Sequence, residues 1–176
     1  MMAGRESGRR PDDSALLGAC GLYCGACYHY RASTADGKHL LEAAVRQGRK
    51  LQGFTCKGCR SSLLYVHPGC AQCEIRACSD RHGVAHCGLC RAFPCERLQA
   101  FQSDGRIHHQ GLVHQLEELA AVGAGLWLAV QARRWRCGCG AAYSWYETVC
   151  PSCGASLPSY GPDPTAPQLP DHGSDW

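Results

Sequence analysis

Large apolar side chains are scarce in this sequence, which has only 3 Phe, 2 Met and 4 Trp among 176 residues. The longest apolar run, Leu119 to Val130, is shorter than the roughly 20 residues that a membrane-spanning helix requires. A TIM barrel, at about 200 residues or more, does not fit this length. Neither a Gly-rich phosphate loop nor a dinucleotide-binding fingerprint is present. These absences predict one or two small domains that need support beyond a conventional core.

The N-terminal part also leads us to expect no export signal. Residues 15–20, ALLGAC, loosely resemble a lipoprotein cleavage box, but only Ala15, Leu16 and Leu17 form the apolar stretch. A signal peptide needs roughly 7–15 apolar residues at that place. We therefore expect a soluble, cytoplasmic protein with no membrane partner. In a reducing compartment, clustered cysteines are more often metal ligands than disulfides.

Cysteine is abundant, with 15 residues, and this odd number excludes complete pairing into disulfides within one chain. Thiolates suit both zinc and iron–sulfur clusters, so the residue type alone does not select the metal. The formal net charge of +3 counts every thiol as neutral. Because thiolates and bound metal change that charge, it is poor evidence for a nucleic-acid partner.

Four cysteines near the C-terminus form the most specific pattern. Cys137 and Cys139 are followed by Cys150 and Cys153 in CGCGAAYSWYETVCPSCG. Two cysteine turns joined by a short β-hairpin are typical of a zinc ribbon, with four tetrahedral ligands at about 2.3 Å. The first pair, Cys-Gly-Cys, is one residue shorter than the usual C-x-x-C, so its turn must be distorted.

The segment between these pairs is aromatic, with Tyr143, Trp145 and Tyr146. We expect these side chains to pack the small module, because a metal domain of this size lacks any other core. The alternative is base stacking on nucleic acid, assisted by the nearby arginines Arg133, Arg134 and Arg136.

Eleven further cysteines lie in the N-terminal part of the chain. They comprise four C-x-x-C pairs, Cys24/Cys27, Cys56/Cys59, Cys70/Cys73 and Cys87/Cys90, and three additional residues, Cys20, Cys78 and Cys95. The four pairs predict two tetrahedral zinc sites, each built from pairs distant in sequence. At least one of the three additional thiols is then expected not to bind zinc. A further site would need a fourth ligand, for which His67 and His86 are the nearest histidines in sequence.

The same cysteines also allow an iron–sulfur interpretation. Three local triplets occur, 20/24/27, 70/73/78 and 87/90/95, and iron–sulfur ligation often combines three local cysteines with one remote cysteine. The last two triplets share the spacing C-x-x-C-x-x-x-x-C and form an internal repeat. The expected cofactors are therefore two or three zinc ions, with an iron–sulfur cluster in the N-terminal domain as the alternative.

Hydrophobic periodicity predicts helices between the cysteine turns. Apolar residues recur at helical spacing from Leu40 to Leu51 and from Leu112 to Ala120, and Gly123 and Gly125 are expected to break the second helix. A further helix is predicted for residues 126–135, and short ones for residues 74–81 and 95–101. The expected fold is a small metal-stabilised α+β protein. Its predicted segments are a disordered head (1–14), a cysteine-rich metal-binding domain (15–104), a helical linker (105–135), a zinc-ribbon hairpin (136–154) and a disordered Pro-rich tail (155–176).

Several motifs resemble, in order, a cysteine-rich prokaryotic family of unknown function. They are CGLYCGAC at 20–27, CKGC at 56–59, CAQCEIRAC at 70–78 and HCGLCRAFPCERL at 86–98. The resemblance extends through GLWLAVQARRWRC at 125–137, which is similar to the linker helix and zinc ribbon of many members. It implies a metal-binding protein without an assigned activity, and it supplies no catalytic residues.

The sequence therefore predicts a zinc-binding protein that acts as an accessory or interaction module with a protein partner. Two alternatives remain open: an iron–sulfur redox protein or enzyme component, and a protein that binds nucleic acid through the ribbon. No catalytic Ser/His/Asp arrangement is evident in the sequence, so whether the protein is an enzyme stays undecided.

Overall fold

The computed structural model describes residues 13–49 and 54–161 of the chain. Their regular structure is helical, with short 3₁₀ helices (η) between α-helices. The elements run η1 (Asp13–Leu16), η2 (Cys24–Ala26), α1 (Tyr28–Ala32), η3 (Ala35–Gly37), α2 (Lys38–Arg46), η5 (Leu63–Tyr65), α3 (Pro68–Ala71), α4 (Glu74–Arg81), η6 (Cys87–Leu89), α5 (Glu96–Gln102), η7 (Ile107–His109), α6 (Leu112–Val122) and α7 (Ala124–Arg134).

Strand pairing in the described residues is limited to isolated bridges. These bridges join Leu17 to Tyr23, Arg136 to Ala142 and Val149 to Ser156. The helical half of the expected α+β class is therefore present, but the described part of residues 136–154 forms no hairpin sheet. The reason is local: each C-terminal cysteine turn is closed by its own bridge, so the two turns do not pair along a common ladder.

Several predicted helices are confirmed. Helix α4 spans the predicted residues 74–81, and α5 begins at Glu96, one residue after the predicted start. Helices α6 and α7 are separated at Gly123, where the backbone has φ +79°, a left-handed value that glycine adopts without steric cost. The break expected at Gly125 is wrong, because Gly125 lies inside α7. Helix α2 ends at Arg46, and Leu51, the last residue of its predicted apolar pattern, lies outside the described residues.

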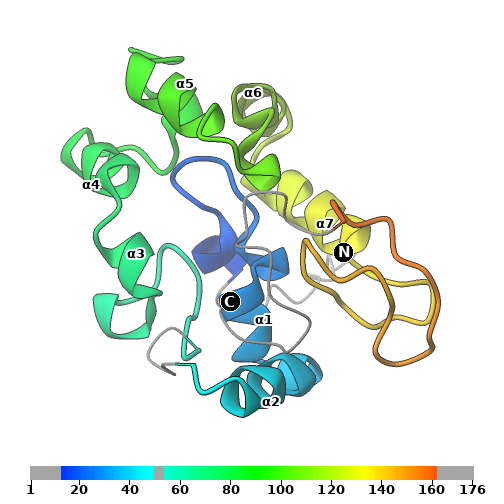
Figure 1. Ribbon diagram of the computed structural model, residues 1–176. Coiled ribbons are helices and arrows are strands. Elements are labelled where there is room, and N and C mark those ends of the chain that lie inside the picture. Colours follow the sequence, from blue (N-terminus) through cyan, green and yellow to red (C-terminus); the bar gives the residue numbers. More distant parts are fainter. Residues whose placement is uncertain (1–12, 50–53, 162–176) are drawn as a thin grey trace, which may run out of the picture.

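The N-terminal segment holds the surrounding cysteine turns together. Its alanine carbonyls accept backbone N–H groups from distant parts of the chain: Ala15 from Arg60 at 3.3 Å, Ala19 from Cys87 at 2.8 Å and Ala26 from Trp145 at 3.0 Å. These three alanines are almost fully buried, with at most 2% of their surface exposed. Small side chains are required at these positions, because each carbonyl is approached closely by another backbone. In Figure 1 this segment, in blue, lies between the α3–α4 side and the α6–α7 side.

One hydrophobic core joins the N-terminal and C-terminal parts. It includes Leu17, Ala19 and Tyr23 from the first segment, Leu116 and Leu119 from α6, Trp127 from α7, and Trp135, Tyr143, Trp145, Cys150 and Leu157 from the C-terminal part. A smaller cluster forms between α1 and α2 from Ala32, Leu40, Ala44 and Phe54. Residues 136–154, predicted as a unit of their own, therefore share their core with the cysteine-rich domain.

The ends of the described chain are more ordered than the sequence suggested. Leu157 is buried, its backbone N–H donates to Thr148 at 2.9 Å, and the Tyr160 ring lies 5.2 Å from that of Trp135. These residues fall in the predicted Pro-rich tail, of which 162–176 lie outside the described residues. Asp13 and Ser14, from the predicted head, begin η1. Residues 1–12 also lie outside. Within the described ranges, no helix is both long and apolar enough to cross a membrane.

Candidate metal centres

The four C-terminal thiols converge on one point. The sulfur atoms of Cys137, Cys139, Cys150 and Cys153 all lie within 4.8 Å of one another. Two of these separations are 3.6 Å, from Cys137 to Cys153, and 3.7 Å, from Cys139 to Cys150. A metal ion bound tetrahedrally by four thiolates at about 2.3 Å sets its sulfur atoms about 3.8 Å apart. The predicted ligand set is thus assembled with the spacing of a single tetrahedral ion.

Each pair is carried by a tight turn that ends in a glycine. The backbone N–H of Cys137 donates to Ala141 and that of Cys150 donates to Ala155, both at 2.8 Å. Gly140 and Gly154 each follow the second cysteine of a pair and have φ values of +94° and +74°. Such left-handed backbone favours glycine, because a side chain would clash with the chain itself.

The shortened Cys-Gly-Cys pair is accommodated by a smaller hydrogen-bonded turn. The N–H of Gly140 donates to the carbonyl of Cys137 at 2.8 Å, three residues earlier, whereas that of Gly154 donates to Cys150 at 2.9 Å, four residues earlier. The missing residue therefore changes the turn from a five-residue to a four-residue one. The convergence of the four sulfur atoms is preserved.

The backbone around the second turn favours a thiolate. The N–H of Ser152, and after it that of Cys153, donate to the sulfur of Cys150 and lower the pKa of this thiol to about 7, against the opposing effect of its burial. At Cys153, the N–H of Ala155 favours the thiolate. Hydrogen bonds between the Cys153 sulfur and the sulfur atoms of Cys139, Cys137 and Cys150 outweigh that effect and raise the pKa of Cys153. Because metal binds the thiolate, a cation at this cluster competes with the proton for the Cys153 sulfur.

Aromatic side chains close the inner side of this cluster. Tyr143 and Trp145 are buried, and the Tyr143 hydroxyl donates to the carbonyl of Arg134 at 3.0 Å. The Trp135 and Tyr143 rings meet edge to face at 5.6 Å. These contacts agree with the packing role predicted for the aromatics. The rings of Tyr143 and Trp145 are not available for stacking on a base in this arrangement.

Eight N-terminal thiols lie near one another around the first segment. Cys20 interacts electrostatically with Cys59, Cys73 and Cys87, and Cys70 interacts with Cys27, Cys59, Cys56 and Cys73. Burial first, and then this mutual repulsion, raises the pKa of both thiols, that of Cys70 to about 12. The backbone N–H of Cys59 donates to the sulfur of Cys24. Pairs distant in sequence thus lie near one another. Among the described residues, however, no four of these sulfur atoms all lie within 4.8 Å of one another, so the two predicted tetrahedral sites are not assembled.

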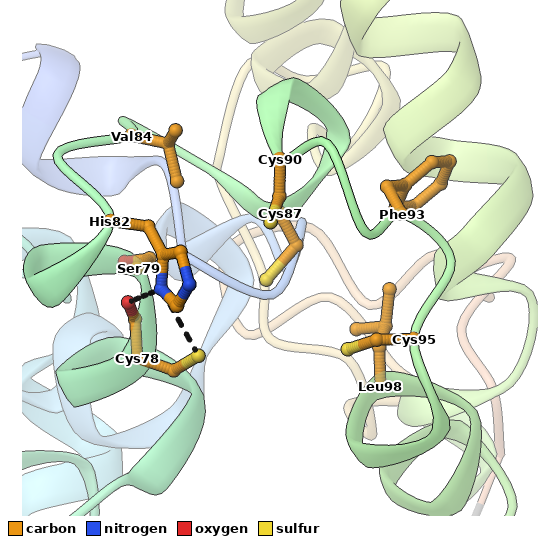
Figure 2. Close-up of a pocket in the computed structure, with 9 residues that line it drawn as sticks. All are labelled: Cys78, Ser79, His82, Val84, Cys87, Cys90, Phe93, Cys95 and Leu98. Carbon is orange, nitrogen blue, oxygen red and sulfur yellow. Dashed lines mark hydrogen bonds between the residues drawn. The ribbon is translucent and has the colours of Figure 1, made fainter.

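The other three N-terminal thiols, together with Cys87, line a cavity. Figure 2 shows Cys78 from α4, Cys87 and Cys90 from the η6 turn, and Cys95 from the residue before α5, all with their sulfur atoms turned toward the same space. Burial, followed by the neighbouring Cys95, Cys78 and Cys90, raises the pKa of the Cys87 thiol to about 11. Counting C-x-x-C pairs did not predict this grouping, because it combines the 87/90 pair with the single cysteines Cys78 and Cys95.

Two histidines, His67 and His86, were considered in the sequence as a possible fourth metal ligand. The His67 ring is tilted against that of His29, with centroids 3.9 Å apart, and its Nδ1 accepts the N–H of Gly69 at 3.2 Å. His86 is buried, and its Nδ1 has no hydrogen-bond partner within the described residues. His82, which the sequence analysis did not single out, lies beside the cavity with Nδ1 3.7 Å from the Cys78 sulfur. Its position four residues after Cys78, at the end of α4, is the signal that could have identified it.

All 15 cysteines are free thiols in the structure. Only the four C-terminal ones form, among the described residues, a group of three or more possible ligands that all lie within 4.8 Å of one another. The chain is thus equipped to bind metal at its C-terminal cluster, whereas the eleven N-terminal thiols are gathered more loosely.

Comparison with known protein families matches residues 16–100 to a family described as a protein of unknown function, DUF3795. No curated protein and no solved structure matches the chain. The matched residues contain all eleven N-terminal cysteines and end before the C-terminal four. The resemblance drawn from the motifs over residues 18–154 is confirmed for this part. Residues 16–100, just under half of the chain, are thus similar to the DUF3795 family, whose function is unknown.

Proposed function

We propose that this chain is a zinc-binding protein of the cytoplasm in which one zinc ion, held by Cys137, Cys139, Cys150 and Cys153, fixes residues 135–161 against the cysteine-rich domain. The observation that carries the proposal is the convergence of the four sulfur atoms within 4.8 Å. Four thiolate ligands fill a tetrahedral zinc site and leave no open position, which is the arrangement of structural rather than catalytic zinc. The zinc at this site therefore acts on the fold and not on a substrate.

The contacts around the site support this structural role. The backbone N–H of Trp145 donates to Ala26, and the Arg31 guanidinium donates to the carbonyl of Ala142 at 3.3 Å. The His39 imidazole and the Glu147 carboxylate are 2.6 Å apart. All three contacts join the segment between the two cysteine pairs to the N-terminal domain. A zinc ion that orders this segment also orders the interface.

Metal analysis of the purified full chain tests the proposal. The wild-type chain is expected to contain zinc, and Cys139→Ser is expected to lose one zinc ion per chain. Ser152→Ala, a change in the same turn at a residue whose side chain is not a ligand, serves as the matched control and should retain it. Equal zinc content in the wild type and Cys139→Ser would contradict the assignment.

The assembled protein then serves as an interaction module for a protein partner. The observation that favours this role is η5, where Leu63, Leu64 and Tyr65 are exposed by 63%, 82% and 52% of their surface. Consecutive exposed apolar side chains of this kind are more typical of contact surfaces than of isolated surface residues. We expect Leu64→Ser to lose a partner that copurifies with the wild type, while Leu126→Ser, at another exposed position on α7, retains it. Retention by both variants would exclude η5 as the contact.

A further inference from the structure

The cavity lined by Cys78, Cys87, Cys90 and Cys95 offers a second set of metal ligands, separate from the proposed zinc site. These thiols come from three consecutive parts of the chain: α4, the η6 turn and the residue preceding α5. All four line a single small cavity of about 30 Å³, together with apolar side chains such as Val84, Phe93 and Leu98. In Figure 2 the four sulfur atoms are turned inward around this space. The lining contains four soft thiol ligands and no carboxylate.

The spacing of these sulfur atoms differs from that of the C-terminal cluster. They do not all lie within 4.8 Å of one another, although the four C-terminal sulfur atoms do. A single tetrahedral ion needs sulfur atoms about 3.8 Å apart. An iron–sulfur cluster places several metal ions and bridging sulfides between its cysteine ligands, so these ligands stand farther apart. The C-terminal thiols are therefore spaced for a single ion, and the cavity thiols are not.

The order of the ligands in the sequence agrees with this distinction. Cys87, Cys90 and Cys95 form a local triplet, and Cys78, on the preceding helix, is the fourth residue. Three local cysteines and one remote cysteine recur in iron–sulfur proteins. The triplet is also held in place by backbone contacts. The N–H of Cys87 donates to Ala19 at 2.8 Å, and a Cβ added to Gly88 would lie 2.8 Å from the carbonyl of Leu116. The η6 turn is thus seated against both the N-terminal segment and α6.

A positive charge lies beside the cavity. The Arg60 guanidinium donates to the Ser79 hydroxyl at 2.8 Å and to the carbonyl of Val84 at 3.2 Å, and both of these residues line the cavity. Arg60 also pairs with Asp80. A cluster bound by four thiolates carries net negative charge, and a fixed cation in its surroundings lowers the cost of burying that charge.

We propose that Cys78, Cys87, Cys90 and Cys95 bind a [4Fe–4S] cluster, with Arg60 as a cationic neighbour. The chain then holds two chemically different centres: a zinc ion that fixes the C-terminal part and an iron–sulfur cluster within the DUF3795 domain. The proposal does not depend on the zinc site, since the two ligand sets share no residue.

The test is anaerobic reconstitution of the full chain with ferrous iron and sulfide, followed by analysis of iron, acid-labile sulfide and zinc. The wild type is expected to bind about four iron and about four sulfide per chain, with the broad visible absorption of a cluster. Cys95→Ser should lose most of the iron and sulfide. Cys70→Ser, in the other N-terminal group, should retain both, and Cys139→Ser should lose zinc alone.

Zinc content provides the folding control in this experiment. Cys95→Ser that keeps its C-terminal zinc has retained the fold, so its loss of iron then reports on the cavity. The proposal is overturned if the wild type takes up no iron and sulfide, or if Cys95→Ser keeps them. It is also overturned if Cys70→Ser loses them while keeping zinc, or if Cys95→Ser removes a zinc ion instead. Failure of the zinc proposal would appear separately, as unchanged zinc in Cys139→Ser.

Discussion

The backbone N–H of Trp145 donates to the carbonyl of Ala26 at 3.0 Å. Ala26 lies inside the Cys24–Cys27 turn, and Trp145 lies between the two C-terminal cysteine pairs. The carbonyl of Trp145 in turn accepts the N–H of Tyr160 at 2.9 Å. This chain of hydrogen bonds connects the first cysteine turn, the C-terminal cluster and the end of the described chain. Loss of metal at the C-terminal cluster should therefore also loosen the structure of the N-terminal domain.

Hydrogen exchange tests this connection. In Cys139→Ser, faster exchange is expected both in residues 135–161 and in residues 19–27, because metal binding and folding are coupled in small metal sites. Ser152→Ala should leave both regions as protected as in the wild type. Faster exchange confined to residues 137–153 would mean that the cluster folds as a separate unit.

Glu147 is expected to stabilise the same interface. One carboxylate oxygen lies 2.6 Å from Nε2 of His39, and the other accepts the N–H of the buried Ser144 at 2.6 Å. Glu147→Ala leaves that N–H without its partner, which costs about 1–3 kcal/mol. Urea unfolding at neutral pH measures the difference. Glu117→Ala, on the exposed face of α6, should change the free energy of unfolding by less than about 0.5 kcal/mol. An equal effect of the two changes would argue against a role for Glu147 in the interface.

Gly58 fixes the turn between Cys56 and Cys59. Its φ is +105°, and an added Cβ would lie 2.2 Å from the carbonyl oxygen of Ala15, a contact that the backbone cannot relieve without moving. Gly58→Ala should therefore destabilise the domain by more than the roughly 1–2 kcal/mol of a left-handed alanine alone. Gly83→Ala provides the comparison, because Gly83 has φ +63° but open space around it. Thermal unfolding of both variants should show the larger loss for Gly58→Ala, and the reverse order would contradict this account.

His29 is predicted to make the protein sensitive to acid. Burial first, and then His67 and Arg49, lowers the pKa of His29 from about 6.5 to about 3. Below pH 6.5 the unfolded chain therefore binds more protons than the folded chain, and stability falls as the pH decreases from about 6.5 toward 3. One such group contributes a slope of at most about 1.4 kcal/mol per pH unit.

The comparison of His29→Phe with the wild type isolates this contribution. Phe keeps a ring beside Phe54 and His67 but has no proton to bind. Urea unfolding at pH 7 and pH 5, at equal metal content, should show a smaller loss of stability on acidification for His29→Phe. His114→Phe, at an exposed position on α6, should behave like the wild type. Identical pH dependence of His29→Phe and the wild type would refute the role of His29.

The local features of this fold could be predicted from the sequence. Helix α4, the break at Gly123 and the C-terminal ligand set follow from short-range spacing, which periodicity and turn residues report directly. Contacts between distant segments could not be predicted in this way. The Trp145–Ala26 hydrogen bond and the grouping of Cys78 with Cys95 depend on how separate turns dock on the N-terminal segment. The pattern of C-x-x-C pairs does not carry that information. The predicted hairpin sheet is absent among the described residues because each cysteine turn closes on itself.

The central claim is that Cys137, Cys139, Cys150 and Cys153 together bind one zinc ion, and X-ray absorption at the zinc edge tests it most directly. The account predicts that zinc in the wild-type chain is surrounded by four sulfur atoms at about 2.3 Å. The same signal should be lost in Cys139→Ser and retained in Ser152→Ala. Zinc coordinated mainly by nitrogen or oxygen, or a four-sulfur signal that persists unchanged in Cys139→Ser, would contradict the claim.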